Sequence, residues 1–479
     1  MNLLEKAIAV LSPQTALRRA RAHLQLSQVR KYDAAASGRR TSGWMTASWG
    51  ANAETAAALP KLRDRHRDLV RNNPWAARAV QAIVSHTIGY GITAKVTATK
   101  AAQEAWKRWA ETTQCDADGR NNLYGLQGLV LRTVVESGEC LVRVRWRKAT
   151  DGLALPMQLQ VLEPDYLDIS RTTQLDTGRI VQGVEFDLIG RRVAYWLFTD
   201  HPGDVLGYAA ESKRVPASDV AHIYRSDRPG QVRGVPWGAP TMLTLRDLDD
   251  YEDAYLFRNK LANCQVGVIF DSESGIANAE AAAAGAPLGE AMEPGRYEFL
   301  PPGKDIRFNT PPSAGDYGPY TRDVLLRVAA AYGVTFAALT GDLSSVNFSS
   351  GRMGRIDMHR NIDMWTWQML APQLLDTIVS WAGAAAELAS LGAAAKFKAK
   401  WAPPRREMIN PAQDVTATID AVRGGLMSLP AAHRELGEDS EEVIAEIKES
   451  NAALDAAGIK LDSDPRFTKG ASNASPPKT

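Results

Sequence analysis

Hydrophobic residues recur at three- and four-residue steps in several long stretches of the chain, a spacing that predicts helices with one buried side. The clearest stretch follows Pro240, which suits the first turn of a helix. One apolar stripe there consists of Met242, Leu245, Leu248, Tyr251 and Tyr255. Acidic residues at 247, 249, 250, 252 and 253 fill the other side, and we interpret them as a solvated face because they do not converge on one point. A helix is predicted over 236–262.

The same spacing predicts further helices. They cover 59–88, 101–110, 123–137, 277–289, 320–332 and 352–381, and two more, separated by Leu429-Pro430, lie between 411 and 456. Gly333 suits a helix C-cap, and Pro372 should kink the helix that contains it, because proline removes a backbone hydrogen bond. The loop over 341–351 is rich in glycine and serine, and Asn347, Ser349 or Ser350 is expected to cap the helix that follows.

Alternating apolar and polar positions predict strands. At 140–147 the apolar Val142, Val144 and Trp146 alternate with arginines at 143, 145 and 147, which gives the strand one basic face. That face is the best local candidate for an anionic partner; the alternative is an edge strand whose charge prevents aggregation. Other strands are predicted at 158–162, 180–188, 192–198, 220–224, 266–270, 296–300 and 305–308, with a hairpin turn at Gly190.

Composition describes an ordinary folded chain. Its 479 residues are 45% hydrophobic and carry a formal net charge of +1, so about three domain-sized units are expected and a global basic excess is absent. The first 58 residues are expected to form a loosely ordered arm and residues 461–479 a disordered tail. Three cysteines without CxxC spacing argue against disulfides and zinc and for a reducing compartment. No membrane span or secretory signal is expected.

The chain lacks the motifs of common enzyme classes. Phosphate-binding GxxxxGK[ST], HExxH, GxSxG and GxGxxG sequences are missing, so no catalytic residue, metal or cofactor is predicted. His359 has no second ligand at suitable spacing, and capping is a sufficient explanation for Glu163 and Asp165. The arginines at 63, 65, 67 and 71 are interleaved with Asp64 and Asp68 and suggest a self-neutralised helix surface. A nuclease with scattered Mg²⁺ ligands stays an alternative.

Six blocks, in order, resemble the portal proteins of tailed phages, and specifically the lambda-like family. They are RDLVRNNPWAARAVQAIVSHTIGYGI (67–92), LEPDYLD (162–168), GRRVAYW (190–196), RPGQVRGVPW (228–237), YGVTFAALTGDLSSVNFSSGR (332–352) and WAPPRREMINPAQD (401–414). The resemblance spans nearly the whole chain and depends on the order of the blocks. The alanine-rich segment 277–286 carries no recognisable family signature.

The resemblance implies an α+β portal fold with long helices and small mixed sheets, assembled head-to-tail in a closed ring, usually of twelve subunits. The implied parts are an N-terminal arm (1–58), wing (59–235), first stem helix (236–262), clip (263–318), second stem helix (319–333), tunnel loop (334–350), kinked wing helix (351–400), crown (401–460) and tail (461–479). A short N-terminal piece is removed during head maturation in such proteins, which implies a trimming event here.

The function implied by the resemblance is a channel at one capsid vertex for DNA packaging, DNA ejection and head–tail joining. The implied partners are other copies of the chain, the large terminase subunit, a head–tail adaptor, the major capsid protein, a scaffold or protease, and double-stranded DNA without sequence specificity. The protein would reside in the virion, and in the host cytoplasm during assembly. The alternatives are a metal-dependent DNA-processing enzyme and a monomeric capsid adaptor.

Two groups of site residues follow from this mapping. The tunnel-loop residues expected to approach DNA are Leu339, Thr340, Asp342, Leu343, Ser344, Ser345 and Val346. In the clip, Arg296, Lys304 and Arg307 are expected to face the terminase or the adaptor, although an ordinary solvated surface would explain them as well.

Overall fold

The computed structural model describes residues 48–204, 211–263, 267–271, 304–308, 317–408, 410–438 and 440–459, with 39, 42–43 and 461. The chain divides into two units, 1–50 and 51–479, and the fold below is that of the second unit. The helix predicted at 277–289, the strand predicted at 296–300 and Arg296 lie outside the described residues.

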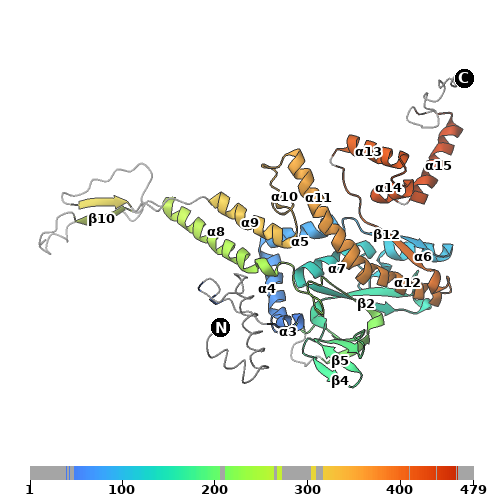
Figure 1. Cartoon of the computed structure of the whole chain (residues 1–479), viewed down its shortest axis with the longest axis horizontal. Helices are drawn as coiled ribbons and strands as arrows, with labels where there is room; N and C mark the ends of the chain where they lie inside the picture. Colours follow the sequence, from blue (N-terminus) through green and yellow to red (C-terminus); the bar gives the residue numbers. More distant parts are fainter. Residues whose placement is uncertain are drawn as a thin grey trace, which may run out of the picture. The chain divides into compact units, whose positions relative to one another are not determined.

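A three-stranded antiparallel sheet lies at the centre of this unit (Figure 1). Strand β2 (Glu139–Trp146) pairs with β3 (Met157–Leu162) on one side and with β9 (Val220–Tyr224) on the other. The predicted alternation is confirmed at Val142 and Val144, which are buried, whereas Trp146 is exposed. The edge-strand alternative is wrong as far as Arg143, where β2 is hydrogen-bonded on both sides; beyond Arg143 the strand pairs only with β3.

Helices cover the apolar face of this sheet and build the main core with it. They are α4 (Leu59–Asn72), α5 (Pro74–Thr87), α6 (Lys100–Glu111), α7 (Leu123–Ser137) and α12 (Asp376–Leu388); a short helix α3 spans Ala51–Ala56. The single helix predicted over 59–88 is broken at Asn73. Its backbone is extended, and its side chain accepts hydrogen bonds from the backbone nitrogens of Trp75 and Ala76, which caps α5.

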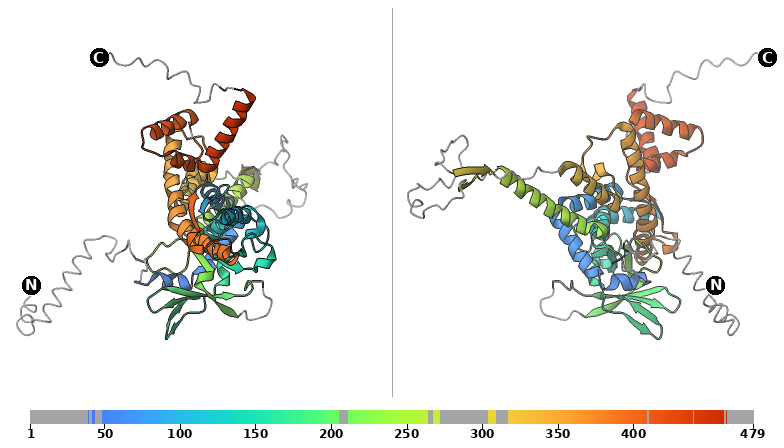
Figure 2. Two further views of the ribbon diagram at one scale, coloured as in Figure 1. Left: turned by 90° about the vertical axis from the view of Figure 1, so that its right-hand side faces the viewer. Right: turned by 60° about the vertical axis from the view of Figure 1, so that its left-hand side comes forward.

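A five-stranded sheet packs on the opposite face of the three-stranded sheet (Figure 2). Its strands, in spatial order, are β4 (Thr173–Leu175), β5 (Gly178–Val181), β6 (Val184–Asp187), β7 (Arg192–Phe198) and β8 (Ser212–Pro216). The strand predicted over 180–188 is two strands, because Gln182 and Gly183 both adopt positive φ and form a tight turn. The hairpin turn predicted at Gly190 is confirmed, with φ of 84°.

Two helices, α8 (Met242–Asn263) and α9 (Tyr317–Tyr332), run side by side (Figures 1 and 2). The stripe predicted for α8 is buried at Met242, Leu245 and Leu248, and aromatic contacts continue it along the pair. The ring centroids are 4.7 Å apart in the Tyr251–Tyr320 contact and 4.8 Å apart in the Tyr255–Tyr317 contact. The backbone of β10 (Gly267–Asp271) pairs antiparallel with that of β11 (Lys304–Phe308), close to the predicted strands.

After α9 comes α10 (Phe336–Thr340) and then a continuous helical run of three parts. These are α11 (Phe348–Met364), the π-helical segment η8 (Trp365–Leu375) and α12. Pro372 lies inside the π-helical segment, which satisfies the backbone differently from an α-helix and lets the helix continue past the proline. Asn347 is the N-cap of α11, as predicted, in a reciprocal pair with Ser350.

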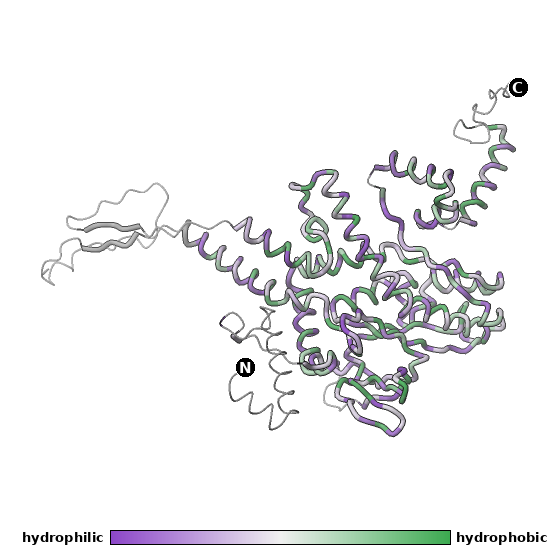
Figure 3. Tube along the Cα trace, viewed as in Figure 1, coloured by the Kyte–Doolittle hydropathy of each residue, from purple (hydrophilic) through white to green (hydrophobic). Residues whose placement is uncertain are grey.

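The C-terminal part begins after β12 (Lys398–Ala402), which pairs with β1 (Thr93–Thr97). The wing–crown boundary expected at 401 therefore falls inside a strand. Beyond it lie α13 (Pro411–Arg423), α14 (Leu429–Glu435) and α15 (Ser440–Ala457), three helices where two were predicted. Pro430 does not separate helices but occupies the first turn of α14, which Ser428 caps. Figure 3 shows hydrophobic and hydrophilic positions interspersed along α8 and α15.

Short 3₁₀ turns complete the described fold. They cover 113–115, 149–151, 164–166, 217–219, 239–241 and 394–396. No helix in the described ranges combines the length and the apolar character that crossing a membrane requires.

Candidate functional site

A fully buried carboxylate joins four segments of the chain. Glu139, at the start of β2, accepts hydrogen bonds on Oε1 from Arg63 and from Arg233 Nε, the latter at 2.7 Å. Its Oε2 accepts from His222 Nε2 and from the backbone nitrogen of Gly234, each at 2.8 Å. Burial alone would raise the pKa of Glu139, but the two guanidinium groups and His222 hold it well below its usual range. The carboxylate is therefore charged and saturated with donors.

The two arginines also donate hydrogen bonds to backbone carbonyls. Arg233 donates from Nη1 to Gln182 at 2.9 Å and from Nη2 to Pro164 at 3.2 Å, while Arg63 Nε donates to Ser137 at 3.1 Å. Burial lowers the pKa of Arg63 to about 10, so it stays charged at neutral pH. Since Gln182 lies in the β5–β6 turn, Arg233 ties the two sheets together.

His222 is held in its neutral form. Its Nε2 donates to Glu139, and its Nδ1, 3.3 Å from Arg192 Nη1, can only accept, because a guanidinium has no lone pair to offer. Burial lowers the pKa of His222 to about 4, against the raising effect of Glu139. A neutral imidazole therefore lies beside a charged carboxylate in the interior between the two sheets.

A second histidine connects α4 to α9. His66 Nδ1 lies 2.6 Å from the Glu136 carbonyl, to which it must donate, so its Nε2, 2.5 Å from Tyr332 Oη, accepts the hydroxyl proton. A Cβ at Gly238 would lie 2.2 Å from this Nε2 and 2.1 Å from Tyr332 Oη. Gly238 is thus required by close approach, and the segment leading into α8 meets α4 and α9 at this contact.

The loop over 341–347 is held onto α9 by one arginine. Arg322 Nη2 donates to Ser345 Oγ at 3.0 Å, and Nη1 lies 3.6 Å from Asp342 Oδ2. The guanidinium carbon of Arg322 also lies 4.7 Å from the centre of the Phe336 ring. Within the loop, Asp342 Oδ1 accepts from the backbone nitrogen of Ser344 at 2.9 Å, and the hydrogen bonds to Ser344 lower the pKa of Asp342.

The predicted channel residues fall into two groups. Leu343 is 64% exposed, Val346 is 36% exposed, and Ser344 and Ser345 are exposed beside them. The expectation that Leu339 approaches DNA is corrected. Its side chain is 1% exposed because α10 directs it into the core, so it cannot reach a ligand. Thr340 is half-buried and donates from Oγ1 to the Phe336 carbonyl at 2.9 Å.

The clip residues are described only through the backbone. Lys304 and Arg307 lie on β11, opposite Asp271 and Val268 respectively. Their assignment to a partner surface stays a prediction.

One group of three potential metal ligands occurs among the described residues: Glu163, Asp165 and His201. Arg67 Nη2 already lies between the two carboxylates, 3.0 Å from Glu163 Oε2 and 2.5 Å from Asp165 Oδ2. It lowers the pKa of Asp165 against the effect of burial. A cation would have to displace this guanidinium, and the arrangement is that of a saturated ion pair.

The same contacts correct two interpretations. Glu163 and Asp165 are explained by pairing with Arg67 and not by capping, since neither caps the 3₁₀ turn at 164–166 with its side chain. Arg63 and Arg67 are neutralised by acids from other elements and not by Asp64 and Asp68 of their own helix.

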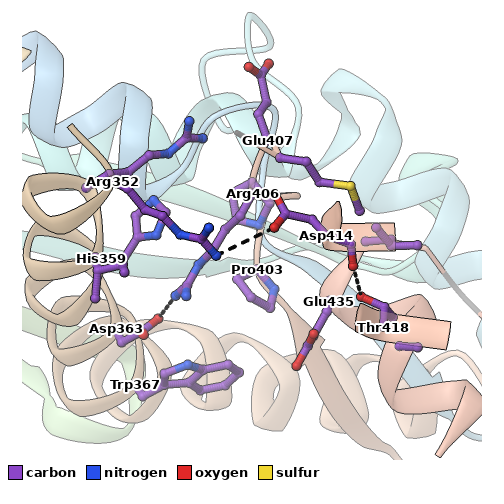
Figure 4. Close-up of a pocket in the computed structure, with 16 residues that line it drawn as sticks. Arg352, His359, Asp363, Trp367, Pro403, Arg406, Glu407, Asp414, Thr418 and Glu435 are labelled. Atoms are coloured by element: carbon purple, nitrogen blue, oxygen red, sulfur yellow. Dashed lines mark hydrogen bonds and ion pairs between the residues drawn. The ribbon is translucent and has the colours of Figure 1, made fainter. Parts of the chain in front are cut away.

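A cavity of about 490 Å³ lies between α11, the segment 403–408, α13 and α14 (Figure 4). Arg352 lies 3.7 Å from Asp414 across it, and Arg406 pairs with Asp363. His359 lines the same cavity, where burial, together with Arg406 and Arg355, lowers its pKa to about 4. The lining mixes both signs of charge with apolar side chains and selects no single ligand.

Sequence reasoning missed Glu139, Arg233, His222 and Arg322 as organising residues. Arg63 is 76 positions from Glu139 and Arg233 is 94 positions from it, so no local pattern could connect them. The available signal was weak: an acid at the first position of a strand whose other early residues are apolar.

Comparisons with known proteins agree with the sequence blocks. Residues 37–366 match the model of the family described as phage portal protein, lambda family. The chain is 27% identical over 436 residues to a probable portal protein of Halomonas phage phiHAP-1, covering 83% of this chain and 81% of that protein. It is 21% identical to portal protein B of Escherichia phage lambda, covering 91% and 92%.

A solved structure is similar as well. It is the neck of an empty GTA particle computed with C6 symmetry, with a TM-score of 0.47 and 18% identity, covering 83% of this chain and 97% of that chain.

Proposed function

Because the chain belongs to the lambda family of phage portal proteins, we propose that it forms the portal of a tailed phage or prophage. The portal is a ring of identical subunits at one capsid vertex, through which double-stranded DNA enters during packaging and leaves during ejection. The match over residues 37–366 carries this proposal, since it takes in the elements from α4 to α11.

Exposed apolar side chains support assembly from copies of this chain. Leu243 and Phe257 on α8, Met353 on α11 and Ile447 on α15 are each at least half exposed. A head-to-tail ring needs two different complementary surfaces on every subunit, and exposed apolar side chains on several helices are available to contribute to them. The subunit number we propose is twelve.

We propose that the loop residues Leu343, Ser344, Ser345 and Val346 line the channel. Their side chains carry no positive charge, and a surface that lets DNA slide should avoid neutralising phosphates, because each such contact adds affinity. Arg322 supports the proposal because it fixes the loop to α9 through Asp342 and Ser345. Its positive charge is paired with Asp342 and is therefore not offered to DNA.

The remaining assignments follow from the same proposal. The hairpin β10–β11, with Lys304 and Arg307, faces the large terminase subunit or a head–tail adaptor, and the wing contacts the major capsid protein. The protein works in the virion after assembly in the host cytoplasm, and without catalysis, since it supplies a passage and a docking surface.

Electron microscopy of the full-length chain in negative stain, together with native mass measurement, tests the proposal. Rings with a central hole and a mass of about twelve subunits are expected. A chain that stays monomeric both alone and when coexpressed with its capsid protein contradicts it. Incubation of a DNA duplex with Mg²⁺ tests the enzyme alternative, since cleavage by the pure protein would support that alternative.

Two further experiments test the site assignments. A photo-crosslinker at Ser344 should label DNA in packaged particles, and an absence of labelling would remove the loop from the channel. Reversing the charges of Arg296, Lys304 and Arg307 together should weaken terminase or adaptor docking, whereas unchanged docking of both would leave them as ordinary surface residues.

A further inference from the structure

The face of the three-stranded sheet that carries Leu141 also carries two arginines that make no short ion pair within the described residues. Arg143 and Arg145 are half-buried on β2, and neither guanidinium has an ion pair or a hydrogen bond to any residue that the structure describes. Other arginines of the wing differ: Arg67 pairs with Asp165, and Arg214 pairs with Glu185 at 2.9 Å. The positive charge of Arg143 is therefore opposed only at longer range, by Asp219.

The strand register defines what else this face presents. Arg143 lies opposite Gln160 and Arg145 opposite Gln158, so two amides stand beside the two guanidinium groups. Residues two apart on a strand project from the same face at about 7 Å spacing. Arg147 continues the row and donates from Nε to Gln158 Oε1 at 2.8 Å. We call these five residues the arginine face.

The positive charges on the arginine face repel one another. Burial lowers the pKa of Arg143, and the neighbouring charge of Arg145 lowers it further. Asp219 acts on Arg143 only at longer range, and its Oδ1 accepts from Trp146 Nε1 at 3.5 Å. An anion placed against the arginine face would relieve this repulsion.

We propose that the arginine face binds the phosphate backbone of double-stranded DNA, as a contact separate from the channel loop at 341–347. Arginine and glutamine side chains are of the kind that hold phosphates without reading bases, although Gln158 already donates from Nε2 to the Asp116 carbonyl at 2.9 Å. The apolar residues of the same sheet face, Leu141, Leu162 and Val220, are buried beneath the five-stranded sheet. The arginine face itself is thus without the apolar anchor that protein interfaces use, which favours DNA over an acidic protein.

The inference rests on the proposed function only for the identity of the polyanion, since a portal handles double-stranded DNA. Its test uses the assembled full-length protein and relaxed, covalently closed circular DNA. A closed circle cannot thread through a preassembled ring, so its retention reports contacts outside the channel. Binding is measured by cosedimentation over a range of salt concentrations, and ring assembly is scored separately by electron microscopy.

The wild-type protein should retain the circle at low salt. The double variant R143Q/R145Q should bind at least about tenfold more weakly, and its plot of log affinity against log salt should be shallower by about 1.8 for two lost phosphate contacts. The variant R143K/R145K keeps both charges and should retain most of the binding. The matched control R65Q/R191Q removes two exposed arginines elsewhere and should bind as the wild type does.

Three results would overturn the inference. One is that R143Q/R145Q keeps both the wild-type affinity and the wild-type salt slope. Another is that R65Q/R191Q loses as much binding, which would show a general charge effect. The third is that R143Q/R145Q retains the circle but no longer binds purified capsid protein, which would make the face a protein-docking surface. If the double variant misfolds by circular dichroism, R145Q alone is tested, with half the slope change expected.

A failure of the portal proposal would look different. In that case no ring forms, whereas a failure of this inference leaves rings that do not retain the circle.

Discussion

Glu139 is the residue on which the polar interior between the two sheets depends. It is fully buried, and its four hydrogen-bond donors come from α4, β9 and the 233–234 segment. A buried charge is tolerated only while its partners are present, because an unpaired charge in a protein interior has lost its hydration without compensation. Removing one member of this group therefore affects all the others.

The variant E139Q tests this dependence. It leaves Arg63 and Arg233 without their counterion, so the free energy of unfolding should fall by on the order of 3–5 kcal/mol. Urea titration at pH 7.5 measures the change. The control is D363N, which breaks the pair between the exposed side chains of Asp363 and Arg406 and should cost under about 1 kcal/mol. Similar losses in the two variants would contradict a special role for Glu139.

The neutral state of His222 predicts a dependence of stability on pH. Its pKa is about 4 in the fold and 6.5 as the ordinary value, so the unfolded chain binds more protons in between. The contribution of neutral His222 to the free energy of unfolding is present above pH 6.5 and is lost as the pH falls towards 4. This contribution is on the order of 3 kcal/mol. The lowered pKa of His66 acts in the same direction.

Urea titrations between pH 7.5 and 5 measure this slope while most carboxylates are still ionised. In H222Q the amide can donate to Glu139 and accept from Arg192 without titrating, so the slope should become flatter. An unchanged slope would show that other groups control the pH dependence.

At the scale of elements, Arg322 decides how the loop over 341–347 is held. The variant R322A removes the contacts to Asp342 and Ser345, so the backbone amides of the loop should exchange hydrogen a few-fold faster. Hydrogen exchange followed by mass spectrometry measures this change. The control R327A, at an exposed position of the same helix, should leave the loop protected. Equal exchange in R322A and the wild type would show that the loop is held by its own turns.

Long amphipathic helices could be predicted from the sequence, and short paired elements could not. The helix over 123–137 and the core stripe of α8 follow from spacing alone, because the pattern repeats over several turns. Strands β1 and β12 have five residues each and a partner some three hundred positions away, so neither carries a local signal. The π-helical segment around Pro372 depends on packing that a propensity does not contain.

The candidate site shows the same division. A loop over 341–351 was predicted from its composition and its place between two helices, and residues 343–346 within it are exposed. Leu339 was assigned to it because nothing in the sequence announces the short helix α10. His66 and Tyr332 are 266 positions apart, and their contact depends on the missing side chain of Gly238. Such contacts are properties of the tertiary fold.

At the scale of the whole molecule, substitutions on the exposed face of α8 should impair ring assembly without impairing the folding of the single chain. Leu243 and Phe257 are 71% and 62% exposed in the single chain, so L243S/F257S should barely change its thermal unfolding. If this face meets a neighbouring subunit, the same variant should lower the ring fraction strongly in native mass spectra.

The control for this experiment is L188S/I189S, which removes two equally exposed apolar side chains at the β6–β7 turn. Rings should persist in that variant. Loss of rings in both variants would indicate a general loss of solubility, and loss in neither would remove α8 from the interface.

The pairing of β1 with β12 has a consequence for synthesis. Residues 93–97 leave the ribosome long before residues 398–402, their only strand partner in the described sheets. Until then the nascent chain presents an unpaired strand edge, which is a template for pairing with other chains. A chain released before residue 398 is made would keep the edge of β1 open to such pairing. Completion of β12 therefore protects β1 from pairing with other chains.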